Sequence, residues 1–449
     1  MKLQTLKNKL TNKHFLSLAG NGIMAVLSVV SLGMIFHNLP AKEAGAYVFF
    51  QAAFALIDTI RTGFLQTALI KFFSGTARER GQEVLGSIWF IALLITLSSF
   101  IITIPFFFLL PYIDNIGAAL TIKWFALIFT ITLPIVITSW ILQAKGDFGS
   151  ILLIRLINQG SFILLLSMLI MNGRLDLTNT IAANFFSCFL AATTIFIMGW
   201  SQIATVTRRT KKCIYEICHF GKYSMGTTIS SNLLRSSDTF IINFMLGPAA
   251  VAIYSLPQRL MEIIEIPLRS FMATGMTSLS AASNRNNSEE VGNIMKKYAG
   301  TITLCILPIA VVAIIFADAA VLLLGGAQYV GTEAANVFRI FMLFGILFPI
   351  ERFQGVTLDM IHKPHLNLIK MIMMLTINIS GDFIGLYLLG NVYGVALASI
   401  PTFLSGLIFG FIALRRYISH SFMDYFRVGY KEWKSLAGPY IPKLKAIGP

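Results

Sequence analysis

The chain has 449 residues, a formal net charge of +15 and a mean hydropathy of +0.75, and 56% of its residues are hydrophobic. Soluble domains average about 45–50% apolar residues even when glycine is counted, so this composition excludes an ordinary soluble domain and predicts a polytopic membrane protein. The positive charge does not indicate nucleic-acid binding, because the basic residues lie in short loops between apolar runs rather than on one soluble face.

Apolar windows of about 20 residues or more are long enough to cross a hydrocarbon core of about 30 Å. The first window is too long for a signal peptide and many others follow it, so we expect an uncleaved first helix. The windows predict an all-α protein with twelve transmembrane helices, at residues 14–36, 45–73, 84–110, 119–142, 148–170, 178–201, 222–246, 250–281, 298–323, 334–360, 366–389 and 392–416.

The basic residues alternate between the two sides of this predicted topology. Clusters such as Arg208 to Lys212 fall in every second loop or at a terminus, whereas the intervening loops contain little beyond Lys42 and Arg174. By the positive-inside rule both termini are expected on the cytoplasmic side of the membrane.

A basic loop over residues 202–222 separates the first six windows from the last six. An offset of 207 residues pairs Tyr47 with Tyr254 and Asp58 with Glu265, and an even number of spans between the copies makes the repeat parallel. We therefore predict two six-helix lobes related by a pseudo-two-fold repeat, at residues 1–210 and 211–420. Residues 421–449 resemble an amphipathic helix lying on the inner leaflet, because aromatic and basic residues share a helical spacing.

The hairpin over residues 223–271 has charged residues at bilayer depth. A charge at the centre of a spanning helix costs about 2.5–3.5 kcal/mol on insertion scales, so these side chains must face water or one another. Helical spacing places them in stripes, which favours a hydrated interior and a substrate pathway. The charged residues are Arg235, Asp238, Arg259, Glu262, Glu265 and Arg269.

The second window also contains an acid and a guanidinium on one face, Asp58 and Arg61. The structural alternative is that Asp58 with Arg61, and Arg235 with Asp238, form ion pairs within their helices and hold them in a bundle. Arg155 either lines the interior or extends to the surface, and the adjacent Glu351 and Arg352 point in different directions. Asp382 is either a coupling-ion site or a partner for a neighbouring helix.

No catalytic or cofactor motif is found in the sequence. GxxxxGK[ST], HExxH, GxSxG and CxxC are absent, so we expect neither nucleotide hydrolysis nor enzymatic activity, and any energy source is expected to be an ion gradient or the membrane potential. The four cysteines and six histidines have no metal-ligand spacing, and no metal site is predicted.

Several segments together resemble bacterial polysaccharide flippases of the multidrug/oligosaccharidyl-lipid/polysaccharide exporter superfamily. They are LPAKEAGAY and LGPAAVAIY before the second and eighth helices, RSSDTFIINFMLG in the seventh, and ILQAKGDF after the fourth. The resemblance covers nearly the whole chain. It implies a V-shaped pair of lobes around a central cationic cavity, and the transfer of an undecaprenyl-diphosphate-linked oligosaccharide from the inner to the outer leaflet, for O-antigen, capsule or exopolysaccharide assembly.

The resemblance also implies roles for the charged residues. Arginines would bind the diphosphate, since the planar guanidinium suits phosphate oxygens; the candidates are Arg61, Arg235, Arg259 and Arg269, followed by Arg155 and Arg352. The acids would hold the guanidiniums in place or bind a coupling H⁺ or Na⁺; the candidates are Asp58, Asp238, Glu262 and Glu265. No cofactor is expected, and a polysaccharide polymerase and export machinery are expected partners besides the lipid-linked substrate and membrane lipids.

Two transport functions remain as alternatives. A multidrug or cation antiporter of the same superfamily should line its cavity with acids and aromatic residues, whereas here arginines are as frequent as acids. A lipid II flippase typically has two further helices that this chain lacks. A polymerase or scaffold would need a large external loop, which the sequence does not contain.

Overall fold

The computed structural model of the chain describes residues 13–73, 76–285 and 287–437. Within these ranges the secondary structure is helical, with no strand. The elements are α2 (Lys13–Asn38), α3 (Ala41–Phe73), α4 (Arg78–Leu109), η1 (Leu110–Tyr112), α5 (Ile116–Lys145), α6 (Phe148–Met171), α7 (Leu177–Ile197), η2 (Ile203–Arg208), α8 (Lys211–Met245), α9 (Pro248–Asn284), α10 (Ser288–Ile315), α11 (Ala317–Gly325), η3 (Ala327–Tyr329), α12 (Ala334–Gly345), α13 (Phe348–Met360), α14 (Pro364–Leu389), α15 (Val392–Arg415) and α16 (Phe422–Ala437).

Each predicted window overlaps one helix or two consecutive helices, although α8 and α10 begin 11 and 10 residues before the windows at 222–246 and 298–323. Among the described residues, eight helices are long and apolar enough to cross a membrane, or nine if α12 and α13, which bend by 51°, form one broken span. The all-α, multi-pass fold is thus confirmed, whereas the number twelve and the pseudo-two-fold repeat stay predictions. Neither α8 nor α9 is among the eight, and these two helices contain the charged stripes.

Polar side chains and glycine define several helix ends. Asn115 and Asp147 accept hydrogen bonds from the backbone amides of Ala118 and Ser150, at 3.0 and 3.1 Å, and so cap the starts of α5 and α6. Between these helices Gly146 has φ of 73°, a left-handed conformation that stops α5 and that glycine adopts without steric cost. The fourth predicted window therefore ends where its ILQAKGDF segment turns.

Contacts divide the chain into two compact units. The first contains residues up to Ser255 together with Leu324–Gln328, and the second contains Leu256–Leu323 and the residues from Tyr329 onward. This boundary falls inside α9 rather than at residue 210, because α8 packs along α3 and joins the first unit. The division into lobes at 1–210 and 211–420 is inferred from an internal sequence repeat, and it stays a prediction.

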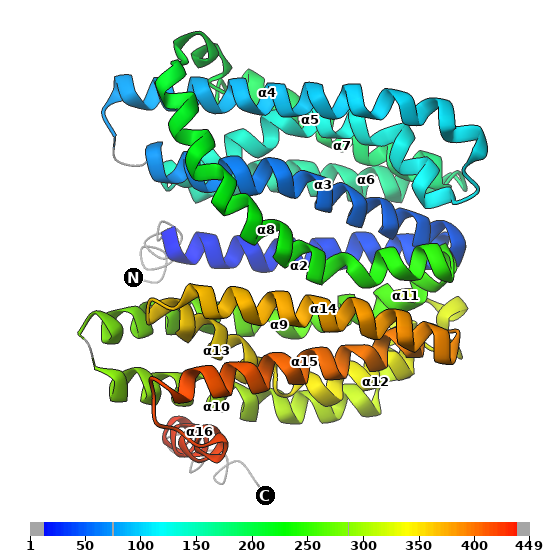
Figure 1. The fold of residues 1–449 in the computed structure, drawn as a ribbon. Helices are drawn as coiled ribbons and strands as arrows, with labels where there is room; N and C mark the ends of the chain where they lie inside the picture. The colour runs from blue at the N-terminus through cyan, green and yellow to red at the C-terminus, as the bar shows by residue number, and fades with distance from the viewer. Residues whose placement is uncertain (1–12, 74–75, 286, 438–449) are drawn as a thin grey trace, which may run out of the picture. The chain divides into compact units, whose positions relative to one another are not determined.

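In the first unit, α3 is the helix against which its neighbours pack. It contacts α5 on one side and α8 on another, and α6 lies against both α2 and α7 (Figure 1). Glycines permit the close approach of α3 and α8: a Cβ atom at Gly63 would lie 2.9 Å from Cβ of Thr228, and one at Gly221 would lie 2.6 Å from the carbonyl oxygen of Phe64. A larger residue at either glycine would therefore push α3 and α8 apart.

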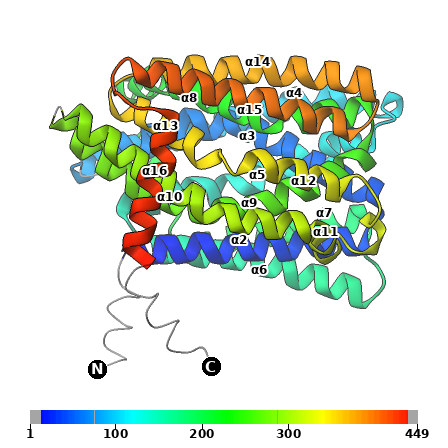
Figure 2. The ribbon, with the colours of Figure 1, turned by 90° about the horizontal axis from the view of Figure 1, so that it is seen from below.

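In the second unit, α14 and α15 run side by side, and α13 packs against α10, α14 and α15 (Figure 1). The helix α16 lies across α10 (Figures 1 and 2). Gly300 and Gly429 meet at the crossing, where a Cβ atom on either would collide with the other helix's backbone. Tyr425 is buried there, whereas Met423 and Trp433 are exposed. The membrane-surface role of the tail stays a prediction, and residues 438–449 lie outside the described residues.

His420 lies between α15 and α16 and packs against Tyr425 of α16, so we expect the docking of α16 to depend on pH. The ring is buried, with Nδ1 2.9 Å from the carbonyl oxygen of Ile418, and it packs on Phe411. Burial lowers the pKa of His420 below its ordinary value of about 6.5, Lys296 and Arg415 lower it further, and Asp424 opposes them.

The lowered pKa sets the sign of the effect. The folded state favours the neutral ring. The stabilisation that the neutral ring provides is therefore complete above about pH 6.5, the pKa in the unfolded chain, and is lost as the pH falls from there through the lower pKa of the folded state. We expect amide hydrogen exchange in α16, corrected for intrinsic rates, to be faster at about pH 5 than at about pH 7.5. His420→Asn should abolish this difference, and the exposed His365→Asn should not; equal protection of α16 at both pH values in the natural sequence would contradict the prediction.

Candidate functional site

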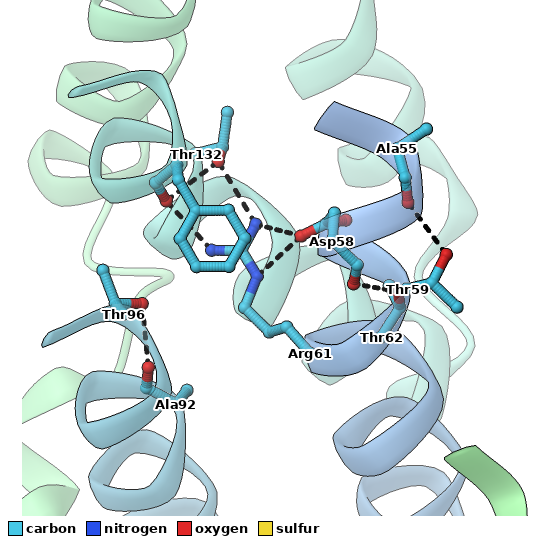
Figure 3. Close-up of polar contacts among 9 residues, drawn as sticks. Ala55, Asp58, Thr59, Arg61, Thr62, Ala92, Thr96 and Thr132 are labelled. Carbon is cyan, nitrogen blue, oxygen red and sulfur yellow. Dashed lines mark hydrogen bonds and ion pairs between the residues drawn. The ribbon is translucent and has the colours of Figure 1, made fainter. Parts of the chain in front are cut away.

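Arg61 on α3 is enclosed by protein. Its side chain is 0% exposed, and its Nε donates a hydrogen bond of 2.8 Å to Oδ1 of Asp58, one turn earlier on the same helix. The other two nitrogens reach α5, where Nη1 donates to the carbonyl oxygen of Phe129 at 3.0 Å and Nη2 donates to Oγ1 of Thr132 at 3.2 Å (Figure 3). The ring centroid of Phe129 lies 4.1 Å from Cζ.

This geometry joins α3 to α5. All three guanidinium nitrogens have protein partners, so binding a phosphate there would require at least one of these bonds to break. The contacts match the structural alternative, an intrahelical pair of Asp58 with Arg61, with the addition of two acceptors on α5. A role for Arg61 in substrate binding stays a prediction.

Asp238 on α8 has a partner that the sequence analysis missed. Its Oδ2 accepts a 2.6 Å hydrogen bond from the hydroxyl of Tyr254 at the start of α9, and both side chains are buried. Arg235, one turn earlier on α8, is exposed. The two residues that sequence reasoning treated as one pair thus lie in different environments. The LGPAA turn between α8 and α9 brings the tyrosine to the acid, a contact between two helices that no spacing within either helix predicts.

On α9, in the second unit, Arg259 and Glu262 form an ion pair of 2.9 Å one turn apart, with side chains that are 37% and 32% exposed. Glu265 follows on the same face and is half-buried. This partial exposure contrasts with the enclosed Arg61. The side chain of Arg269 lies outside the described residues.

The two lower-ranked arginines also reach the surface of their units. Arg155 on α6 is exposed, and the Arg352 side chain on α13 is 50% exposed, with its Nε 3.8 Å from Oε2 of Glu351. Glu351 points elsewhere, as the different directions of neighbouring residues on a helix require. Its Oε1 accepts a 2.7 Å hydrogen bond from Nζ of Lys370 on α14, and both side chains are buried.

Sequence reasoning missed Lys370 entirely, although a signal was present. Glu351 lies nine residues before the end of α13 and Lys370 lies six residues after the start of α14, so a hairpin of these two helices brings both residues to a similar depth. Gly355 leaves room for the ammonium group, because a Cβ atom there would lie 2.9 Å from Nζ. Asp382, the other acid considered in this region, is buried on α14 and accepts a 3.0 Å hydrogen bond from Asn378; its role as a coupling-ion site stays a prediction.

The charged residues therefore fall into two groups. One group is buried and joins helices: Arg61 with Asp58, Asp238 with Tyr254, and Glu351 with Lys370. The other group has guanidiniums that solvent or a ligand can reach: Arg235, Arg259, Arg155 and Arg352. A phosphate could reach the guanidiniums of the second group from the surface of their units, whereas Arg61 would first have to break a buried hydrogen bond. Within the described residues, no cluster of three or more His, Cys, Asp or Glu side chains is arranged to hold a metal ion.

Solved structures share this fold. An inward-facing multidrug resistance MATE transporter of the MOP superfamily is 16% identical, with 88% of this chain and 95% of that chain covered and a TM-score of 0.72. The lipid II flippase MurJ, in an inward closed conformation, is 15% identical, with coverage of 97% and 94% and a TM-score of 0.74. A MOP superfamily transporter from Pyrococcus furiosus is 16% identical, with coverage of 91% and 95% and a TM-score of 0.59.

The chain thus shares its fold with multi-pass membrane transporters of the MOP superfamily. Sequence comparison is more specific: the family model described as polysaccharide biosynthesis protein matches residues 10–276, and the MatE model matches residues 223–384. Because the first match spans more than half of the chain, the protein belongs to the polysaccharide biosynthesis protein family, and the resemblance to polysaccharide flippases is confirmed. Comparison with curated proteins finds no match.

Proposed function

We propose that this protein is a flippase that moves an undecaprenyl-diphosphate-linked oligosaccharide from the inner to the outer leaflet of a bacterial plasma membrane. The product would supply O-antigen, capsule or exopolysaccharide assembly, with a polymerase and export machinery as partners. The observation that carries the proposal is the match to the polysaccharide biosynthesis family over residues 10–276. Relatives in fold include a lipid II flippase, which also acts on a lipid-linked substrate.

The accessible arginines support this substrate class. Arg235 on α8 is exposed and Arg259 on α9 is half-buried, and both lie in segments that the sequence predicts to cross the membrane, where a charge is retained at a cost. A guanidinium binds two phosphate oxygens at once, and its charge persists at any physiological pH. Glu262, which is bonded to Arg259, would orient that guanidinium, while Glu265 is a candidate for binding a coupling H⁺ or Na⁺. Alternating access between two lobes, with cytoplasmic termini, completes the proposal.

The test is export in cells whose own copy of the gene is deleted and replaced by variants. Arg235→Ala and Arg259→Ala should each reduce polysaccharide export by roughly 10- to 100-fold, the value of a lost charged hydrogen bond, and should cause the lipid-linked precursor to accumulate. Arg285→Ala is the matched control, since that arginine is exposed between α9 and α10. Membrane levels of all variants must be equal. Wild-type export from both single variants would overturn the assignment of these residues.

A multidrug or cation antiporter is the second candidate, because the MatE model matches residues 223–384 and MATE transporters share the fold. It predicts that deletion raises sensitivity to cationic drugs and leaves polysaccharide unchanged. The flippase proposal predicts the reverse. A lipid II flippase would instead be indicated if deletion led to accumulated lipid II and to lysis.

A further inference from the structure

A surface hollow lies where α3 ends and α8 begins, within the first unit. Its volume is about 410 Å³. It does not include any of the arginines proposed for transport. The lining residues are Lys71, Phe72, Tyr215, Glu216, His219 and Phe220.

Aromatic rings form the floor and one wall of this hollow. Phe72 and Phe220 meet edge to face, with ring centroids 5.7 Å apart, and both pack against the hydrophobic core of the first unit. Tyr215 and His219, one turn apart on α8, stack with ring centroids 6.1 Å apart, and Tyr215 is 71% exposed. The floor is therefore fixed by the core, while the wall is open to whatever surrounds the helices.

Lys71 brings a positive charge to this apolar surface. Its ammonium nitrogen lies 4.1 Å from the ring centroid of Phe220 and 5.5 Å from that of Phe72. None of the ion pairs among the described residues includes Lys71, so its charge is balanced by ring faces and not by a carboxylate. A ring face leaves the remaining ammonium protons free to donate to a ligand.

The acid in the lining does not cancel this charge. Glu216 is bonded to Arg80 on α4, which also pairs with Glu83 at 2.9 Å. Lys212 is exposed one turn before Tyr215 and Glu216, on the same face of α8. The mouth of the hollow is consequently basic, and its floor is apolar.

The position of the hollow indicates what surrounds it. Lys71 is two residues from the end of α3, one of the helices apolar enough to span a membrane. A lysine and aromatic rings at the end of such a helix lie at the level of lipid headgroups. Apolar floor and basic mouth thus face the acyl chains and the phosphates of one leaflet, respectively.

We propose that this hollow binds an anionic phospholipid of that leaflet, with the phosphate on Lys71 and the first part of an acyl chain on Phe72 and Phe220. A cationic headgroup is disfavoured, because Lys71 already occupies the ring faces that would attract it. A free anion would gain nothing from the phenylalanine floor. The inference depends on the membrane-spanning fold and not on the transported substrate.

The test uses the full chain in detergent, titrated with short-chain phosphatidylglycerol and with phosphatidylcholine of the same tails. We expect tighter binding of phosphatidylglycerol. Lys71→Gln should weaken that binding by about fivefold, the value of one basic residue beside an anionic lipid, and should leave phosphatidylcholine binding unchanged. Lys145→Gln, which removes an exposed lysine from the end of α5, should have no effect. Phe220→Leu should weaken the binding of both lipids.

Two further probes separate the sources of phosphate. Inorganic phosphate should compete poorly, and farnesyl diphosphate should bind no better to the natural sequence than to Lys71→Gln. Equal affinity for the two phospholipids, or unchanged phosphatidylglycerol binding by Lys71→Gln, would overturn the proposal. Lys71-dependent binding of farnesyl diphosphate without phosphatidylglycerol binding would also overturn it and would assign the hollow to the substrate. The flippase proposal is unaffected by any of these results, because its test is export by the arginine variants.

Discussion

Arg61→Ala is expected to lower the free energy of unfolding by about 3–5 kcal/mol, the cost of removing one partner of a buried ion pair. The substitution removes the partner of Asp58, whose side chain is 18% exposed, and it leaves the Phe129 carbonyl and the Thr132 hydroxyl without their donor. It also leaves a cavity between α3 and α5. The measurement is the fraction of protein that remains monodisperse after heating, or unfolding in a denaturing detergent series.

Two comparisons separate a lost ion pair from a general effect of losing arginine. The double variant Asp58→Leu with Arg61→Met should regain most of the stability, because replacing both charges with apolar groups of similar size is often neutral. Arg259→Ala removes an arginine with the same spacing to its acid, but that pair is about one-third exposed and should contribute less than about 1 kcal/mol. If Arg61→Ala is as stable as the natural sequence and fails in export, Arg61 acts on substrate and its structural role is disproved.

Much of the fold follows from local pattern. An apolar run of about 20 residues must form a helix in a bilayer, because no water is present to satisfy the backbone. The helix ends at Asn115, Gly146 and Asp147 also follow from residue type. The unit boundary does not, because it depends on how closely α8 approaches α3 at Gly63 and Gly221, and such contacts between distant segments leave no periodic signal.

The same distinction holds for the charged residues. The pairs Asp58 with Arg61 and Arg259 with Glu262 are three residues apart, so helical geometry alone predicts them. The contacts of Arg61 with Phe129 and Thr132 span 68 and 71 residues, and burial of its guanidinium depends on them. Spacing therefore identifies which charges share a face, and only tertiary packing decides which of them a ligand can reach.

The ion pair of Lys370 with Glu351 depends on a helical hairpin and could not be predicted from spacing within one helix. In the sequence it resembles a lysine near the inner end of a spanning helix, which would extend to the membrane surface. Instead the α13–α14 turn folds it back to the level of Glu351, and both side chains are buried. Sequence reasoning compared Glu351 with its neighbour Arg352, whereas the stronger partner is 19 residues away.

Lys370→Met should lower the free energy of unfolding of the second unit by about 3–5 kcal/mol, again because a buried charge is left without its partner. Arg352 offsets part of this loss if its guanidinium, whose Nε is 3.8 Å from Glu351, moves closer. We therefore expect the double variant Lys370→Met with Arg352→Ala to lose more free energy of unfolding than the two single variants lose together. The measurement is thermal unfolding, with hydrogen exchange in α13 and α14 to locate the loss.

The double variant Glu351→Leu with Lys370→Met decides what the pair does. If the two charges serve only to join α13 to α14, replacing both should restore stability, and polysaccharide export should return with it. A double variant that is stable and inactive would show that the charges are needed during transport, which no static contact in the second unit requires. A single Lys370→Met variant as stable as the natural sequence would mean that Glu351 is protonated without its lysine, and that the ion pair does not hold the hairpin together.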